Sequence, residues 1–227
     1  GGLKRIAEVA TFLVPLMGSI YFGAMIVALI LNLNLVLPAF KLIFVDAFNG
    51  TAIAGGTFFG VLIYGVRRGA FSNEAGMGTE SLVHGVAKVS NPVKQGLVAM
   101  TGPIFDTLII CTATALMILV SGVWETSSSQ GVTLTSEAFS VLLGGLGGFI
   151  LFVCVICFGL STIFTYSYYG ASCSRFLFGK FGMKFYIYLY ILSIFIYSIV
   201  PIDIAINIAD GAFAMMAIPT LISALWL

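Results

Sequence analysis

The chain has 227 residues, of which 60% are hydrophobic and 8% are charged, and its formal net charge is +1. Soluble domains carry about 25% charged residues, so this chain has too few charges to coat a soluble globular enzyme, and its apolar content excludes disorder. The balance of 10 basic and 9 acidic residues also excludes a nucleic-acid-binding module, which leaves an all-α polytopic membrane protein.

About six membrane elements are predicted, because a spanning helix needs about 20 mostly apolar residues. One of these elements is discontinuous, and together they make residues 1–227 a single transmembrane region. In chain order the elements cover roughly 9–33, 50–70 with a continuation at 79–87 after a break, 95–121, 143–170, 184–200 and 203–227.

Lysine and arginine residues predict the orientation, since they gather in cytoplasmic loops. Alternating spans place seven of the ten on one side and Lys41 on the other, while Arg67 and Arg68 lie within an element. We expect the side with seven basic residues and the C-terminus to be cytoplasmic, with the protein in the cell membrane. The seven residues are Lys4, Arg5, Lys88, Lys94, Arg175, Lys180 and Lys184.

The connection 122–142 is expected on the outer side, and two interpretations of it stay open. Its polar turn, followed by a helical restart after Thr135, favours a loop that caps the membrane region. The alternative is a passive connector between two spans.

The most informative segment is 67–80, RRGAFSNEAGMGTE, which follows a charge-free run of 20 residues. Ser72 and Asn73 compete with the backbone for hydrogen bonds, and Gly76 and Gly78 permit non-helical dihedral angles, so a helix break is predicted. In lipid, irregular backbone is tolerated only where protein buries it or where it lines a wet cavity. Such breaks form substrate and ion sites in secondary transporters. The alternative is an ordinary cytoplasmic loop after a complete span.

Charged side chains at membrane depth form a second group of candidates. Asp106 lies near the centre of the third element, where an acid costs about 2.5–3.5 kcal/mol to insert, so it needs a partner or a cavity. Arg67 or Arg68 is the expected partner, and Glu74 completes the expected intramembrane charge network. A structural ion pair and a direct role in binding an ion or substrate both stay open.

The end of the fourth element is rich in hydroxyl groups. Ser161, Thr162 and Thr165 fall on neighbouring faces at helical spacing. Oxygen ligands suit hard cations such as Na⁺, so these residues are candidates for a cation site, with no other metal and no cofactor expected. The alternative is that they join helices by hydrogen bonds within the membrane.

Enzyme motifs are not found: the sequence has no HExxH, P-loop or GxSxG pattern, and we expect no enzymatic activity. Residues 65–78, GVRRGAFSNEAGMG, instead closely resemble the signature stretch of the alanine or glycine:cation symporters, the sodium:alanine symporter family. The resemblance covers essentially the whole chain. The supporting strings follow in order at 91–98 (NPVKQGLV), 106–115 (DTLIICTATA), 161–163 (STI), 167–170 (SYYG) and 217–219 (AIP).

The resemblance implies a LeuT-type inverted-repeat fold, of which this chain is the second, C-terminal half, with the first repeat absent. It implies Na⁺-coupled symport of L-alanine or glycine by alternating access, with the lipid bilayer and the missing N-terminal half as further partners and no nucleic acid. The family usually has tryptophan where Tyr166 stands, which implies a more polar pocket wall here. On the matching motifs, the resemblance places the substrate against Phe71, Ser72, Asn73, Gly76, Thr162 and Tyr166, and the cation at Ser161, Thr162 and Thr165.

Two other functions stay open. The first is an H⁺-coupled carrier or a channel on the same scaffold, in which Asp106 and Glu74 carry protons. The second is a non-transporting membrane subunit, which would tolerate Phe71→Ala and Ser72→Ala without loss of activity.

Overall fold

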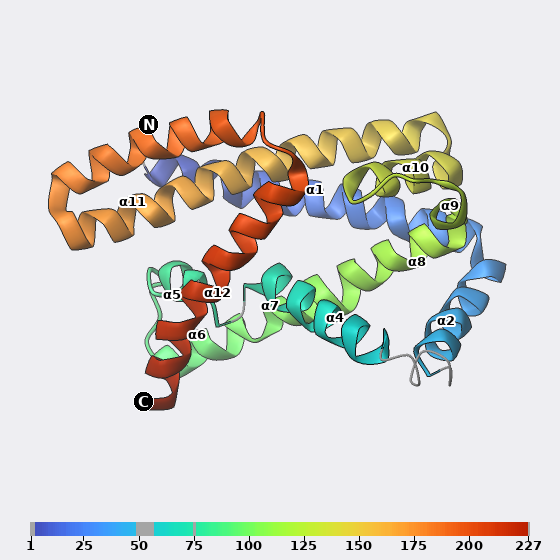
Figure 1. Ribbon diagram of the computed structural model, residues 1–227, viewed down its shortest axis with the longest axis horizontal. Helices are drawn as coiled ribbons and strands as arrows, with labels where there is room; N and C mark the ends of the chain where they lie inside the picture. Colours follow the sequence, from blue (N-terminus) through green and yellow to red (C-terminus); the bar gives the residue numbers. More distant parts are fainter. Residues whose placement is uncertain (1–2, 49–56, 75, 227) are drawn as a thin grey trace. The chain divides into compact units, whose positions relative to one another are not determined.

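The computed structural model describes the backbone of residues 3–48, 57–74 and 76–226, and the side chains of these residues from Phe12 onward except 57 and 58. Within these ranges the regular structure is helical and no strand occurs, so the prediction of an all-α protein is confirmed (Figure 1). The predicted start of the second element, 50–56, lies outside the described residues.

Long apolar helices alternate with short connecting helices along the chain. One helix, η1, is a π-helix, and the others are α-helices. In chain order they are α1 (Leu3–Leu31), α2 (Leu33–Ala47), α4 (Thr57–Asn73), α5 (Thr79–His84), α6 (Pro92–Ala99), α7 (Thr101–Pro103), η1 (Ile104–Cys111), α8 (Thr112–Ser121), α9 (Val123–Thr126), α10 (Val132–Leu143), α11 (Gly145–Tyr197) and α12 (Ile202–Trp226).

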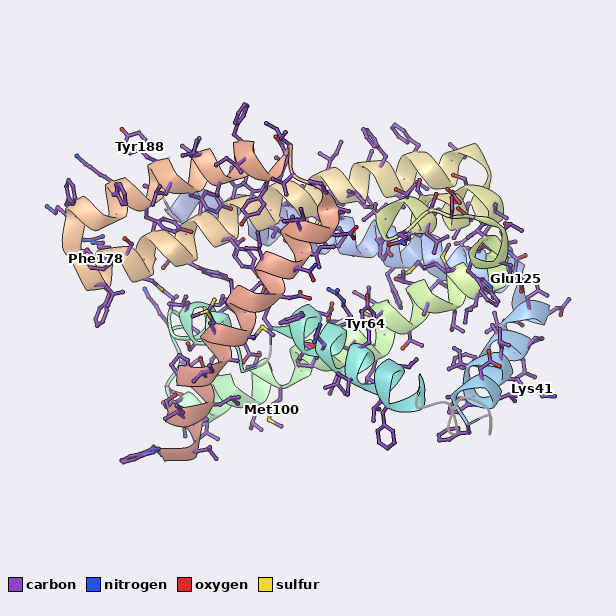
Figure 2. All side chains as sticks on the ribbon, viewed as in Figure 1. Lys41, Tyr64, Met100, Glu125, Phe178 and Tyr188 are labelled. Atoms are coloured by element: carbon purple, nitrogen blue, oxygen red, sulfur yellow. The ribbon has the colours of Figure 1, made fainter. Side chains whose placement is uncertain are left out.

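Among the described residues, four helical stretches are long and apolar enough to cross a membrane. Their large apolar side chains point outward, as Phe178, Tyr188 and Met100 do in Figure 2. Water would not tolerate so much contiguous apolar surface, whereas lipid stabilises it. The four stretches are Phe12–Leu31, Pro92–Ser121, Gly145–Tyr197 and Ile202–Trp226.

The chain divides into two compact units, which are described separately below. Unit one comprises Gly1–Arg68 and Ile104–Ser161. Unit two comprises Gly69–Pro103 and Thr162–Leu227. Helices α4 and α11 each contribute to both units, because the boundaries fall inside them.

The core of unit one forms around Tyr21 of α1. Its ring stacks on Phe139 of α10, with 5.5 Å between ring centroids, and Phe139 is fully buried. The Tyr21 hydroxyl lies 2.9 Å from Oγ1 of Thr114, which itself donates to the Ile110 carbonyl at 2.9 Å. Since the Thr114 proton is used in that bond, Tyr21 is the donor to Thr114. A buried phenol is thereby satisfied, and α1, α8 and α10 are joined at one point.

A close contact at Gly147 sets the packing of α10 against the start of α11. The two helices are separated by Gly144, whose φ of 69° lies in the left-handed region that favours glycine. A Cβ atom added to Gly147 would overlap the backbone carbonyl of Phe139. Glycine at 147 therefore allows the two backbones to approach while Phe139 stays in the core.

Glu137 closes the loop that precedes α10. Ser129 donates from its hydroxyl to the Glu137 carboxylate at 2.6 Å, and the backbone N–H of Ser129 donates to the Ser127 hydroxyl at 3.0 Å. Hydrogen bonds from the Ser129 and Ser127 side chains hold the pKa of Glu137 below its usual value, because they stabilise the ionised form.

Unit two contains a helical hairpin within α11. The helix reverses at Gly179, where φ is 67° and ψ is −156°, and the two arms run side by side (Figure 1). The Tyr190 hydroxyl donates to the Ile163 carbonyl at 2.8 Å across the arms. Gly170 provides a flat surface for the Tyr186 ring, which a Cβ atom at 170 would overlap. The hairpin is thus held by tyrosines of the second arm against the backbone of the first.

Replacing Gly147 by alanine should destabilise unit one by about 1–3 kcal/mol, because overpacking against a backbone carbonyl cannot be relieved by a side-chain rotation. The matched control is Gly145→Ala, where nothing lies within 4 Å of the added Cβ atom. The midpoint of thermal unfolding in detergent, followed by circular dichroism, checks the pair. Equal midpoints for the two variants would contradict the close contact.

Acidification should release the loop before α10. Because the folded-state pKa of Glu137 is lowered, its ionised form stabilises the loop above the ordinary pKa of about 4.3, and this contribution is lost as the pH falls through the folded-state value. Amide exchange of 127–131, corrected for the intrinsic pH dependence, should therefore accelerate in that range. Glu137→Gln should remove the pH dependence and Glu125→Gln should keep it; a profile unchanged by Glu137→Gln would refute this role.

Candidate functional site

The helix that begins at Thr57 stops at Asn73, and a new helix, α5, begins at Thr79. The backbone between them turns sharply, with φ values of 54° at Glu74, 77° at Gly76 and 91° at Gly78. Glycine takes up such angles without strain, but glutamate does so at a cost. Glu74 has the only positive φ outside glycine among the described residues, so it is the strained position of this turn. We call the described residues of this turn, 74 and 76–78, the break.

The far side of the break is buried within unit two. A Cβ atom on Gly78 would come within 2.8 Å of Oγ1 of Thr220 on α12, so glycine permits a close approach there. Thr79 is 1% exposed, and within the described part of the chain its hydroxyl has no hydrogen-bond partner. A buried hydroxyl without a partner is unfavourable, and it marks a place where a water molecule or a polar ligand would be stabilised.

A hydrogen bond ties the break to α11. The Tyr166 hydroxyl donates to Oε1 of Glu74, from a residue 92 positions further along the chain. Hydrogen bonds to an ionised acceptor are stronger than neutral ones, and a carboxylate at membrane depth needs such a donor. The strained residue of the break is therefore also the one that α11 holds.

Aromatic side chains surround this hydrogen bond. Phe213 of α12 contacts Phe71 at a centroid distance of 5.6 Å and Tyr166 at 6.2 Å, and Tyr166 also contacts Tyr169 at 5.6 Å. Edge and tilted pairs of this kind are favourable beyond the area they bury. Phe213 thus contacts the last turn of α4 through Phe71 and α11 through Tyr166, the residue that donates to Glu74.

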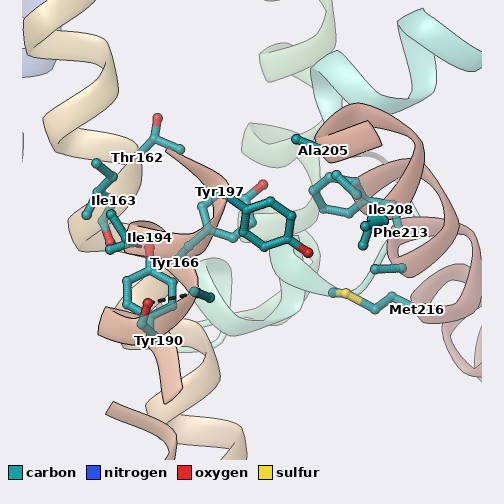
Figure 3. Close-up of a pocket in the computed structure, with 13 residues that line it drawn as sticks. Thr162, Ile163, Tyr166, Tyr190, Ile194, Tyr197, Ala205, Ile208, Phe213 and Met216 are labelled. Carbon is teal, nitrogen blue, oxygen red and sulfur yellow. Dashed lines mark hydrogen bonds between the residues drawn. The ribbon is translucent and has the colours of Figure 1, made fainter. Parts of the chain in front are cut away.

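A cavity of about 760 Å³ lies beside the aromatic cluster, between the α11 hairpin and α12 (Figure 3). This volume falls in the range of small-molecule sites. The wall is mostly apolar, and three of its hydroxyl groups are already used as donors to Glu74 or to backbone carbonyls. The lining residues are Thr162, Ile163, Tyr166, Tyr190, Ser193, Ile194, Tyr197, Ala205, Ile208, Ala209, Ala212, Phe213 and Met216.

The residues expected to contact substrate all belong to unit two. Thr162 and Tyr166 line the cavity, and Phe71 reaches it through Phe213. Ser72 and Asn73 form the end of α4, next to Glu74. Gly76 lies in the break, where a Cβ atom would be 3.7 Å from Leu221 of α12. The structure thus gathers these residues around the break and the cavity, and their contact with a substrate stays a prediction.

The three expected cation ligands lie on consecutive turns of α11. Ser161 donates to the Phe158 carbonyl at 2.9 Å and falls in unit one, whereas Thr162 and Thr165 fall in unit two. Among the described residues, no group of three or more His, Cys, Asp or Glu side chains could hold a metal ion. The binding of a cation by Ser161, Thr162 and Thr165 stays a prediction.

The other three residues of the expected charge network, Arg67, Arg68 and Asp106, belong to unit one. Asp106 lies in the π-helix η1 and accepts a hydrogen bond from the Thr107 hydroxyl at 3.4 Å. Arg68 places its guanidinium 5.1 Å from the centre of the Tyr64 ring, and Arg67 is exposed. The pairing of Asp106 with an arginine stays a prediction.

Sequence reasoning missed Phe213 and two tyrosines of the cavity wall, Tyr190 and Tyr197. The chain has 20 phenylalanines and 9 tyrosines, so residue type alone does not single these out. The contact between Glu74 and Tyr166 was also missed, because an acid at depth was expected to need a basic partner rather than a phenol. Tyr166 itself was among the expected substrate residues, but its hydrogen bond to Glu74 was not predicted.

Comparison with known proteins identifies the class of molecule. The model of the sodium:alanine symporter family matches residues 1–227. Relatives include the sodium/alanine symporter AgcS of Methanococcus maripaludis, 36% identical over all of this chain and 51% of its own length. A probable sodium/glutamine symporter, GlnT of Bacillus subtilis, is 34% identical over 98% of this chain and 47% of its own length. A sodium/proton-dependent alanine carrier protein of Bacillus sp. strain PS3 is 34% identical over 74% of this chain and 41% of its own length.

The chain spans about half the length of the curated relatives it matches first. The family and these relatives are symporters and carriers rather than enzymes, and multi-pass membrane proteins, in agreement with the four membrane-length helices described above. With the family model matched from the first residue to the last, this chain belongs to the sodium:alanine symporter family.

Proposed function

We propose that this chain is the C-terminal half of a Na⁺-coupled symporter that carries alanine or glycine across the cell membrane by alternating access. The observation that carries the proposal is the break, which is tied by Glu74 and Tyr166 to the helix that lines the cavity. Interrupted helices expose backbone groups at membrane depth, and these groups bind substrates and ions in secondary transporters.

Backbone groups at an interruption suit both ends of an amino acid. The C-terminal end of α4 carries the negative end of its helix dipole, which attracts an ammonium group or a cation. Backbone N–H groups freed in the break attract a carboxylate. Phe71, Tyr166 and Phe213 then form apolar walls around the side chain of the substrate, and their size favours a small neutral amino acid.

The coupling ion is proposed to bind oxygen ligands from Ser161, Thr162 and Thr165, with no further cofactor. Thr162 lines the cavity, which supports a role in binding. Coupling follows if Na⁺ and the amino acid both bind more tightly to the same closed state, because each then favours the binding of the other.

The chain is proposed to form the second repeat of a LeuT-type fold. Its coverage of half the length of its relatives supports a partner repeat, which would supply the remaining walls of the cavity. The placement of lysine and arginine residues supports a cytoplasmic C-terminus.

A second candidate is coupling to H⁺ on the same scaffold. One relative is named as a sodium/proton-dependent carrier, which favours this candidate. Two carboxylates also favour it: Glu74 in the break and Asp106 in η1. An intramembrane acid that gains and loses a proton during the cycle could carry this role.

Uptake of labelled alanine and glycine into proteoliposomes tests the proposal with the complete transporter that contains this chain. An inward Na⁺ gradient should drive uptake, and Thr162→Ala and Ser72→Ala should each reduce it by about tenfold, because each removes a polar contact worth about 1–2 kcal/mol. The matched control is Thr133→Ala, on an exposed position of α10 outside the site.

Uptake that ignores Na⁺ but follows a proton gradient would keep the fold and transfer the coupling role to Glu74 or Asp106. Absence of uptake of either amino acid by correctly folded protein would refute the symporter proposal. Equal losses in Thr162→Ala and Thr133→Ala would refute the site.

A further inference from the structure

Glu74 holds a backbone conformation that a glutamate does not adopt on its own. Its φ is 54°, while the other positive angles of the break belong to Gly76 and Gly78. Non-glycine residues persist in this region only when surrounding contacts hold them there. One such contact lies within the backbone, where the Met77 N–H donates to the Glu74 carbonyl at 3.1 Å. The other is made by the side chain.

The side-chain contact comes from Tyr166, which has two roles at once. Its hydroxyl donates to the Glu74 carboxylate, and its ring packs edge-on against Phe213 and lines the cavity. The hydroxyl is therefore used in the hydrogen bond to Glu74, and the aromatic ring is the part that lines the cavity. Because the hydroxyl is already bonded, tyrosine at this position does not make the cavity wall more polar.

We propose that Tyr166 is a positioning residue: its hydroxyl fixes Glu74, and through Glu74 the turn of the break, so that the freed backbone groups are arranged before a substrate arrives. The expected change in transport rests on the proposed function, whereas the expected change in amide exchange rests on the geometry of unit two alone. A preorganised backbone binds its ligand more tightly than one that must first be ordered.

The carboxylate needs this donor for a physical reason. Glu74 is half-buried, and an acid at membrane depth without a hydrogen-bond donor is strongly unfavourable. Loss of the Tyr166 hydroxyl would leave the Glu74 side chain without the bond that orients it. The left-handed turn would then be opposed by its own strain, and the Met77 bond would remain to hold it.

A direct role for the hydroxyl in binding substrate gives a different expectation. In that case Tyr166→Phe would weaken substrate binding but would leave the substrate-free break unchanged. The positioning role changes the break in the absence of substrate. Hydrogen exchange of the substrate-free protein therefore separates the two explanations.

The experiment compares Tyr166→Phe, Glu74→Ala, the double variant and Tyr188→Phe in the complete transporter. Tyr188→Phe is the matched control, because it removes a phenol hydroxyl from an exposed ring of the same helix that does not line the cavity. Amide exchange of 74–79 is measured without substrate by mass spectrometry, and KM and Vmax for alanine and glycine are measured in proteoliposomes.

Tyr166→Phe should accelerate exchange in 74–79 by about tenfold or more, the factor expected for losing a hydrogen bond to a charged group. The KM should rise by a similar factor for alanine and for glycine alike, since the lost contact is with the protein backbone rather than with the substrate side chain. Glu74→Ala should have the same effect, and the double variant should be no worse than either single variant. Tyr188→Phe should stay within twofold of the unchanged protein.

Unchanged exchange in substrate-free Tyr166→Phe would overturn the proposal, as would additive effects in the double variant. If Glu74→Ala does not fold, Tyr166→Phe still decides the matter, because it removes a single oxygen and keeps the ring. If the unchanged protein takes up neither amino acid, the proposed function fails, while the exchange data still report whether Tyr166 holds the break.

Discussion

Peptide groups that leave a helix inside a membrane must find partners in the protein, because lipid offers none. This constraint governs the segment between Asn73 and Thr79, where one helix ends and another begins. Three features around this segment help to satisfy that constraint. Glycines supply the turn, Thr220 approaches the backbone closely, and Tyr166 reaches across from α11 to the carboxylate of the strained residue.

In unit two, tyrosine side chains have a polar role through their hydroxyl groups and an apolar role through their rings. The Tyr166 hydroxyl donates to Glu74 and the Tyr190 hydroxyl donates to the Ile163 carbonyl, so both form hydrogen bonds within the protein. Their rings remain on the cavity wall together with Phe213. A cavity formed in this way is lined by aromatic surfaces, and Thr162 is one of the few polar side chains on its wall.

The sequence was sufficient for the class of fold and for the family. Its low charge and long apolar runs predicted an all-α membrane protein, and the string at 65–78 pointed to the symporter family; both predictions are confirmed. Glycine content near Gly76 and Gly78 also indicated where dihedral angles leave the helical region. These features are local, so they can be recognised without knowledge of tertiary contacts.

Long-range pairings could not be predicted in the same way. Glu74 and Tyr166 are 92 positions apart, and nothing local to either residue indicates the other. Phe213 resembles the other phenylalanines of the chain until its neighbours are known. The π-helix at Ile104–Cys111 depends on a shift in hydrogen-bond register that composition does not encode. The residues expected to bind substrate and cation stay predictions, because no local pattern fixes their contacts.

The reversal of α11 at Gly179 has a consequence for the way this part of the chain enters the bilayer. Its turn carries Arg175, Lys180 and Lys184, and basic residues next to apolar helices resist translocation. The two arms, joined by this short turn, can insert as one paired hairpin. Tyr186 and Tyr190 of the second arm contact the first arm directly. The register between the two arms is therefore set as soon as they meet. One wall of the cavity would then be assembled before α12, the helix that closes it, has left the ribosome.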